Sequence, residues 1–135
     1  MGNIKRNNEK PEWHIQQALI KFLQDRDWLV EHTHGSVYQT GFPDLYLFHR
    51  KWRERWVDCK VAGRYNFTNA QRIKWPEWED KGVGIWILTA ANEDQYAKLF
   101  GPPNFRDYWK ASWGVLPDID KLIHELRTEH QNDRP

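Results

Sequence analysis

Apolar residues in the N-terminal part of the chain recur at the spacing of an α-helix. Residues 1–10 are polar, and Pro11 and Glu12 follow them. The next segment carries an apolar stripe that would cover one side of a helix: Ile15, Leu19, Phe22 and Leu23. Proline fits the first helical turn because its φ angle is already fixed, and an acid there faces the positive end of the helix dipole. The pattern predicts a helix that begins at Pro11.

Two short aromatic and aliphatic segments farther along are joined by a charged loop. They read DLYLFH at Asp44–His49 and RWVDCK at Arg55–Lys60. Segments of this composition, separated by a few polar residues, are typical of a β-hairpin. Another strand is expected to begin at Trp28, before the hairpin.

A helix and a buried strand are predicted after the hairpin. Thr68 and Gln71 have the spacing of a capping box, in which each side chain accepts a backbone N–H of the other residue at a helix start. The helix is expected to end near Lys81-Gly82. Pro76 should kink it or split it in two, because proline removes a backbone hydrogen bond. The continuous apolar run Val83–Thr89 (VGIWILT) indicates a buried central strand.

The order of these elements predicts an α/β fold. A helix, three strands, a second helix and a fourth strand imply a mixed central β-sheet flanked by helices, because a helical crossover makes the strands that it joins parallel. Residues 92–100 should form a short helix that ends at Gly101-Pro102-Pro103. Asp118–Arg127 has the apolar stripe of an amphipathic helix.

The chain shows no internal repeat and is predicted to form one domain. A flexible arm is expected over residues 1–11, the core of the domain over residues 12–90, and a helical extension of the same domain over residues 91–135.

The composition narrows the classes of protein. With 135 residues and a formal net charge of +1, the chain has room for one modest core and lacks an overall basic charge, so DNA binding would require a local patch or a metal. Its single cysteine, Cys59, allows no internal disulfide and suits a reducing compartment. No membrane-length apolar segment or signal-peptide core occurs, so a cytoplasmic protein with no membrane partner is expected. Nine tryptophans exceed what such a core needs, which favours placing some at an interface or a binding surface.

Two acids and a lysine occupy unusual positions on the predicted hairpin. Asp44 follows Pro43 at the start of the first strand. Asp58 and Lys60 should share one face of the second strand, since Cys59 between them points to the other face. Charged side chains are costly to bury unless they are paired. An Asp–Lys ion pair would satisfy them and so would a divalent-metal site, and the pattern leaves both open.

Histidines and basic residues near the hairpin are further candidates. His32 and His34 would share a strand face, but no Cys, third His or helical His pair accompanies them at ligand spacing, so a zinc site is rejected. The loop between the two strands carries Arg50, Lys51 and Arg53 among tryptophans. Such a loop protects a sheet edge or contacts phosphates and stacks on bases, and both interpretations remain open.

The sequence Pro43-Asp44, with Asp58-Cys59-Lys60 farther along, resembles the PD-(D/E)xK nuclease motif. Glu12-x-x-Ile15-Gln16, Gly41-Phe42-Pro43-Asp44 and Thr68-x-x-Gln71 flank these residues in the order of the virus-type replication-repair nuclease (VRR-NUC) module, which is itself similar to archaeal and phage Holliday-junction resolvases. The resemblance covers roughly Glu12 to Leu88 and implies an α-β-β-β-α-β, restriction-endonuclease-like core with extra C-terminal helices. One position departs from it: the acid before the lysine is usually glutamate in this module and is Asp58 here, one methylene shorter.

The resemblance implies a role for each residue of the motif. Asp44 and Asp58 would bind Mg²⁺, or Mn²⁺ in its place, together with the backbone carbonyl of Cys59. Glu12 would be an outer ligand or would orient a metal-bound water, although by itself it is an ordinary surface acid at a helix start. Lys60 would position or deprotonate the nucleophilic water or stabilise the transition state. Gln71 would hydrogen-bond the water or Lys60, although helix capping alone explains its presence.

The activity implied is metal-dependent endonucleolytic hydrolysis of DNA, acting on junctions, branches or nicks in recombination, repair or phage DNA processing. The expected DNA contacts are basic or histidine side chains around the hairpin: His34, Arg50, Lys51, Arg53 and Arg64. A sequence-specific nuclease of restriction or homing type and a non-catalytic DNA-binding relative are the alternatives. The near-zero net charge and the lack of a recognition domain argue against the first, and the complete set of Asp44, Asp58 and Lys60 argues against the second.

A homodimer is expected, because resolving a junction or breaking a duplex requires two cuts and a two-fold dimer supplies two sites. The apolar stripe of the predicted helix Asp118–Arg127 offers an interface: Ile119, Leu122, Ile123 and Leu126. The alternative, that this helix packs on the sheet of its own chain, is left open.

Overall fold

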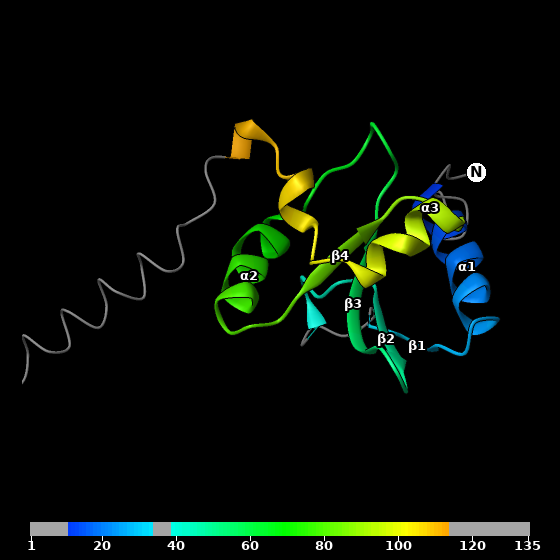
Figure 1. Ribbon diagram of the computed structural model, residues 1–135. Coiled ribbons are helices and arrows are strands. Elements are labelled where there is room, and N and C mark those ends of the chain that lie inside the picture. Colours follow the sequence, from blue (N-terminus) through cyan, green and yellow to red (C-terminus); the bar gives the residue numbers. More distant parts are fainter. Residues whose placement is uncertain (1–10, 34–38, 114–135) are drawn as a thin grey trace, which may run out of the picture.

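The computed structural model describes residues 11–33 and 39–113 (Figure 1). After an initial helix and three strands, the chain forms a second helix, a fourth strand and a short third helix. The helices are α1 (Pro11–Gln24), α2 (Asn69–Asp80) and α3 (Glu93–Tyr96), the strands are β1 (Leu29–His32), β2 (Leu45–His49), β3 (Arg53–Cys59) and β4 (Ile85–Leu88), and the 3-10 turns are η3 (Ala97–Phe100), η4 (Phe105–Tyr108) and η5 (Ala111–Trp113).

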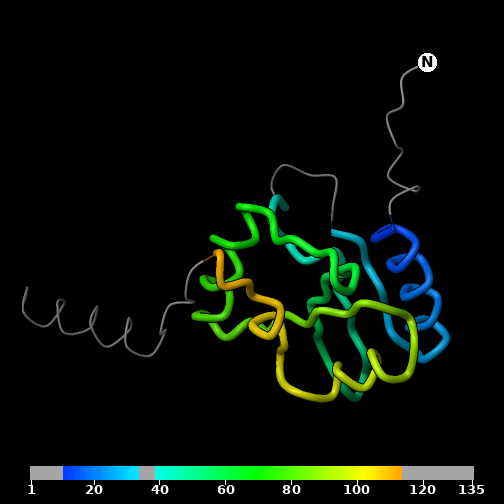
Figure 2. The backbone as a smooth tube through the Cα atoms, turned by 90° about the horizontal axis from the view of Figure 1, so that it is seen from above, coloured from blue at the N-terminus to red at the C-terminus, as the bar shows by residue number. Residues whose placement is uncertain are grey.

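The four strands form one mixed sheet in the order β1-β2-β3-β4. Strands β1, β2 and β3 are antiparallel neighbours, and β4 runs parallel to β3 after the α2 crossover. The predicted α/β class with a mixed sheet is therefore confirmed. Helices α1 and α2 lie on opposite sides of the strands, as two views related by a 90° turn show (Figures 1 and 2).

One core lies between the sheet and α1. It is aliphatic for the most part, because the residues of β2 and β3 that point to this side are Leu45, Leu47, Val57 and Cys59, all fully buried. The predicted helical stripe supplies the facing layer through Leu19 and Leu23, and Leu99 of η3 completes it. Helix α1 is thereby held against the strands that carry the two aspartates.

The core on the other side of the sheet is aromatic. Phe67, Trp75 and Phe105 are buried there against Ile85 and Ile87 of β4. Further tryptophans pack around this cluster, partly buried: Trp56, Trp78, Trp109 and Trp113. Much of the tryptophan surplus therefore contributes to the interior, where each ring removes a large apolar area from water.

Pro76 does not split α2, which runs without interruption from Asn69 to Asp80. Proline removes one backbone hydrogen bond and crowds the preceding turn, at a cost of about 3 kcal/mol. Trp75 is buried in the aromatic core and Pro76 is buried beside it in the chain, and this burial offsets that cost. The strand boundaries also differ slightly from expectation: β3 begins at Arg53 rather than Arg55, and β4 covers only Ile85–Leu88.

A side chain covers the outer edge of β4. The N–H of Ile87 donates to Asn104 Oδ1 at 2.6 Å, and Asn104 Nδ2 donates to the carbonyl of Ile87 at 3.1 Å. The carboxamide thus makes the two hydrogen bonds that a neighbouring strand would make. The Gly101-Pro102-Pro103 segment, which ends η3 as predicted, leads the chain to this position.

Several expectations lie outside the described residues: residues 1–10 of the arm expected over residues 1–11, His34, and the helix expected at Asp118–Arg127. Pro11, the last residue of the expected arm, is the first residue of α1. In the part of the chain that is described, no helix combines the length and apolar character needed to span a membrane.

Candidate functional site

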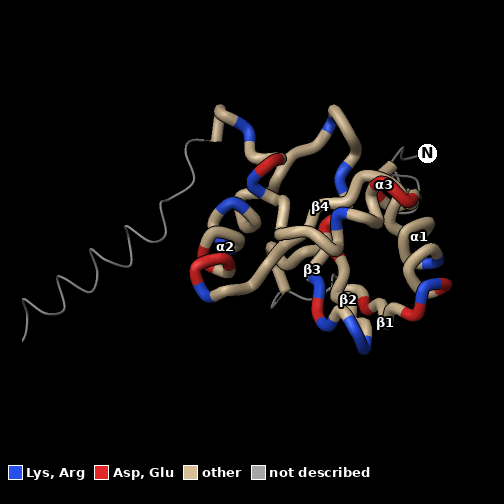
Figure 3. The backbone as a smooth tube through the Cα atoms, viewed as in Figure 1, with Lys and Arg blue, Asp and Glu red and all other residues tan. Residues whose placement is uncertain are grey.

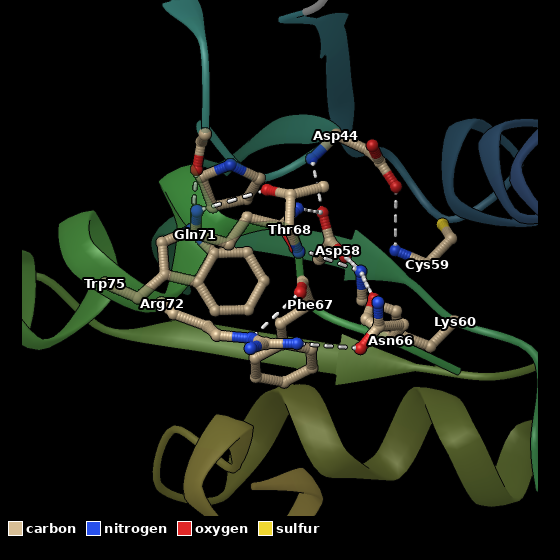
Figure 4. Close-up of polar contacts among 12 residues, drawn as sticks. Asp44, Asp58, Cys59, Lys60, Asn66, Phe67, Thr68, Gln71, Arg72 and Trp75 are labelled. Atoms are coloured by element: carbon tan, nitrogen blue, oxygen red, sulfur yellow. Dashed lines mark hydrogen bonds and ion pairs between the residues drawn. The ribbon is translucent and has the colours of Figure 1, made fainter. Parts of the chain in front are cut away.

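Asp44 and Asp58 lie side by side where β2 begins and β3 ends. The N–H of Asp44 donates to Asp58 Oδ1 at 3.1 Å, and the N–H of Cys59 donates to Asp44 Oδ2 at 3.0 Å (Figure 4). Each carboxylate is therefore held by a backbone donor of the other strand. Thr33, after β1, adds a third support: its side chain donates to the carbonyl of Pro43 and its N–H donates to that of Asp44.

Lys60 occupies the predicted face of the strand beside Asp58, and its ammonium group is almost completely buried. Nζ lies 2.9 Å from Asp58 Oδ2, 3.0 Å from the carbonyl oxygen of Asn66 and 3.2 Å from Gln71 Oε1. The rings of Phe67 and Trp75 enclose the remaining side, with centroids 5.1 and 5.8 Å from Nζ. A neutral amine has only two N–H donors, so three acceptors around Nζ indicate a charged ammonium.

Gln71 both caps α2 and reaches the aspartates, so neither interpretation of it excludes the other. The capping box with Thr68 is present: the N–H of Gln71 donates to Thr68 Oγ1 at 3.1 Å, and that of Thr68 to Gln71 Oε1 at 3.0 Å. The same Oε1 accepts from Lys60, while Nε2 lies 3.5 Å from Asp58 Oδ1. Helix capping therefore fixes the side chain that joins α2 to the site.

Burial and mutual repulsion of the acids dominate the electrostatics. Desolvation, and then the charge of Asp44, raise the pKa of Asp58 to about 7 even though Lys60 acts in the opposite direction. The pKa of Asp44 is also raised, by burial and by the charge of Glu12, against the lowering effects of the Cys59 N–H and Lys60. The pKa of the Cys59 thiol is raised well above its usual value by burial and by the charges of Asp44, Asp58 and Glu12.

Glu12 is thus part of the same electrostatic site. It lies in the first turn of α1 and its side chain is exposed. Its negative charge acts on both Asp44 and Cys59, so it lies in the neighbourhood of the aspartate pair. The sequence-predicted residues Glu12, Asp44, Asp58, Cys59, Lys60 and Gln71 are therefore brought together at one end of the sheet.

Few side chains at this site could act as ligands of a metal ion. Within residues 11–33 and 39–113, no group of three or more His, Cys, Asp or Glu side chains is arranged to hold a metal ion. Mg²⁺ is commonly bound in proteins by one or two carboxylates, completed by waters and substrate phosphate oxygens. The Asp44–Asp58 pair with a nearby backbone carbonyl fits that pattern. Asp58 Oδ2 is buried, and in the described part of the chain Lys60 is its one polar contact, so it has lone pairs left for a cation.

The basic hairpin turn does not join the aspartates. Arg53 pairs with His49 at the turn end of the hairpin, whereas Leu45 pairs with Val57 at the end next to the acids. Four residue steps of about 3.3 Å separate these pairs, so the turn lies about 13 Å along the strands from the site. Figure 3 shows the basic residues of this turn at the far end of the hairpin. The predicted phosphate contacts Arg50, Lys51 and Arg53 are therefore distant from the acids.

Arg64 lies nearer, since it is exposed on the turn that follows Lys60. No sequence signal points to Asn66, which contributes a backbone carbonyl, or to the enclosure of Lys60 by Phe67 and Trp75. A carbonyl ligand has no residue preference, and only the aromatic character of this segment indicated burial.

Gly41 of the Gly-Phe-Pro-Asp segment is held against α2. Its φ angle is +84°, a Cβ at this position would lie 3.0 Å from the backbone carbon of Ala70, and its carbonyl accepts from Trp75 Nε1 at 2.8 Å. Gly63 has a similar φ of +77°, but nothing lies within 4 Å of its would-be Cβ. Among the glycines of residues 11–33 and 39–113, only Gly41 combines the left-handed conformation with a close approach.

Gly41→Ala is expected to destabilise the protein by about 1–3 kcal/mol more than Gly63→Ala, because both variants share the backbone strain and only the first clashes with α2. Chemical denaturation of the two variants measures the difference. Equal losses of stability would show that Gly41 does not require close packing against Ala70.

No family model, no curated protein and no solved structure matches this chain.

Proposed function

We propose that this protein is a divalent-metal-dependent endonuclease that hydrolyses phosphodiester bonds in DNA. The observation that carries the proposal is the Asp44–Asp58 pair with the Lys60 ammonium 2.9 Å from Asp58, assembled at the open end of a hairpin. Support also comes from the topology: three antiparallel strands, a helical crossover and a parallel fourth strand are compatible with a restriction-endonuclease-like core.

Asp44 and Asp58, with the carbonyl of Cys59, would hold Mg²⁺ or Mn²⁺, and Glu12 would bind a water of its outer shell. The cation, when bound, lowers the pKa of water and stabilises charge on the phosphate. Two acids with raised pKa values at one position gain from a cation, because like charges repel when no counter-charge is present.

The reaction is the attack of a water oxygen on phosphorus, with breakage of a P–O ester bond. The attacking water loses a proton to solvent, and the departing oxygen gains one from solvent. Lys60 is surrounded by three acceptors, so it has no free lone pair with which to take the proton. This favours a role in which its positive charge stabilises the pentacoordinate transition state at phosphorus over a role as general base. Gln71 would keep Lys60 and Asp58 aligned through its two amide atoms.

The experiment that tests the function is a cleavage assay with and without a chelator. Cleavage is expected to require Mg²⁺ or Mn²⁺, to stop in EDTA and to return when the cation is added in excess, because the carboxylates alone supply no electrophile. Junction, flap, nicked, single-stranded and plain duplex DNA are compared in parallel. Full activity in the chelator would contradict the proposed function, and cutting at one duplex sequence would favour the sequence-specific alternative.

A further inference from the structure

A continuous set of contacts leads from Lys60 to the surface. Asn66, whose carbonyl accepts from Lys60, also accepts from Arg72 through its side chain at 3.1 Å. Arg72 donates in addition to the carbonyl of Phe67 at 3.1 Å, and its guanidinium lies 4.5 Å from the ring centroid of Trp113. Arg72, the residue after Gln71 on α2, is thus held in place by Asn66, which also contacts the proposed catalytic Lys60 (Figure 4).

Lys110 extends this set. Its ammonium donates to the carbonyl of Tyr65 and lies 4.7 Å from the Tyr65 ring centroid and 5.5 Å from that of Trp113. We refer to Arg72, Lys110 and their aromatic supports Tyr65 and Trp113 as the cationic strip. Figure 3 shows basic residues on α2 and on the segment after η4, at the end of the molecule that carries the loop between β3 and α2.

The charges of the strip are not neutralised by acids in the described part of the chain. Arg26 pairs with Glu93 there, and Arg106 pairs with Glu79. No carboxylate of the described residues lies within ion-pair distance of Arg72 or Lys110. Cation–π contacts hold both groups in place without cancelling their charge.

We propose that the cationic strip binds the phosphates of a nucleic-acid strand that enters the site, through its backbone rather than its bases. A stacking platform would need an open aromatic face. Trp113 instead has Arg72 over its ring and Phe67 at 4.8 Å, and Tyr65 has Lys110 over its ring and Tyr108 at 5.4 Å. The available groups are the cations, which bind phosphates and carry no base information.

The inference rests on the proposed function for its ligand, and it specifies that function further: binding should be insensitive to base sequence. Oligothymidylate and oligoadenylate of equal length should therefore bind with similar affinity. Each phosphate contact contributes about 0.7 to the slope of log K against log salt for a single strand and about 0.9 for duplex DNA.

The test measures fluorescence anisotropy of labelled oligonucleotides across a range of salt, in chelator, so that binding is observed without cleavage. Arg72→Gln with Lys110→Gln is expected to weaken binding roughly ten-fold or more at low salt and to reduce the salt slope by about 1.5. The matched control is Lys21→Gln with Lys81→Gln. Lys21 and Lys81 are also exposed cations, but they lie at the C-terminal ends of α1 and α2, away from the strip. This control should bind like the unmodified protein.

Thermal melting checks that the variants fold, because Arg72 also supports the loop through Phe67 and Asn66. If Arg72→Gln unfolds, Lys110→Gln alone should still lower the slope by about 0.7–0.9, since Lys110 is exposed.

An unchanged slope in the strip variants, or equal losses in the control, would overturn the inference. If the strip variants lose binding and the unmodified protein never cleaves, the proposed function fails and the strip stands. If the unmodified protein cleaves DNA and the strip variants bind normally, the proposed function stands and the inference about the strip fails.

Discussion

Asp58→Asn is expected to abolish DNA cleavage while raising the stability of the metal-free protein above neutral pH. Burial and the charge of Asp44 raise the pKa of Asp58 from 3.8 to about 7, so ionising this side chain opposes folding. Asparagine keeps an acceptor for Lys60 and a group of similar shape, but it provides no negative charge for a cation. Loss of a ligand of this kind should reduce the rate by at least about 10²–10³.

The sign of the pH dependence follows from the same pKa. Between about pH 4 and 7 the folded protein retains the proton on Asp58 and the unfolded chain has lost it, so the free energy of unfolding falls as pH rises and levels off above pH 7. Asp58→Asn should remove this fall, which leaves the variant more stable at pH 8 by on the order of 2–4 kcal/mol. Urea denaturation in EDTA from pH 4 to 9 measures both curves. Parallel curves for the two proteins would contradict the expectation.

Lys60→Met is expected to impair both stability and activity. The ammonium is the one basic partner of Asp58 in the described structure, and its removal leaves the carboxylates of Asp58 and Asp44 without a counter-charge, which typically costs about 3–5 kcal/mol where Asp58 is ionised. Asp58→Asn differs, because Lys60 there keeps the nearby charge of Asp44 and its neutral acceptors. If Lys60 also stabilises the transition state, the folded variant should cut about 10²–10³ times more slowly while binding DNA normally.

A double variant separates these two effects. Lys60→Met combined with Asp58→Asn removes the charge of Asp58 together with that of its partner, so the stability of the double variant should recover most of the loss seen in Lys60→Met alone, a non-additivity that a double-mutant cycle measures. Its cleavage should remain absent. A folded Lys60→Met protein that cuts DNA at nearly the unmodified rate would remove Lys60 from the mechanism and leave it a purely structural role.

The parts of the site that sequence predicts are the ones governed by local rules. Asp58 and Lys60 share a face because strand side chains alternate, and the fixed spacing of a capping box identifies Gln71. The Pro-Asp pair identifies Asp44. These residues converge because the hairpin and the α2 crossover bring their elements together, which the order of the elements already implied.

The parts that sequence misses depend on distance in space. Arg50, Lys51 and Arg53 stand between the two aspartates in the chain, yet the strands carry them to the opposite end of the hairpin. Lys110 is far from Arg72 in sequence, yet both contact Trp113. Nor did the tryptophan count reveal how many rings the aromatic core uses, since burial depends on which elements pack on one another.

The Asn104 carboxamide on β4 has a consequence for how two copies of this chain can associate. Its two hydrogen bonds occupy the outward-facing N–H and carbonyl of Ile87, so a strand of a neighbouring molecule cannot pair with that residue. Head-to-tail growth, in which β1 of one copy pairs with β4 of the next, would require that free edge and would produce open fibres. Strand β1 is the other edge of the sheet. The Asn104 contact thus hinders extension of the sheet at β4, whereas pairing of β1 with β1 of a second copy would be a self-complementary contact that closes at two molecules.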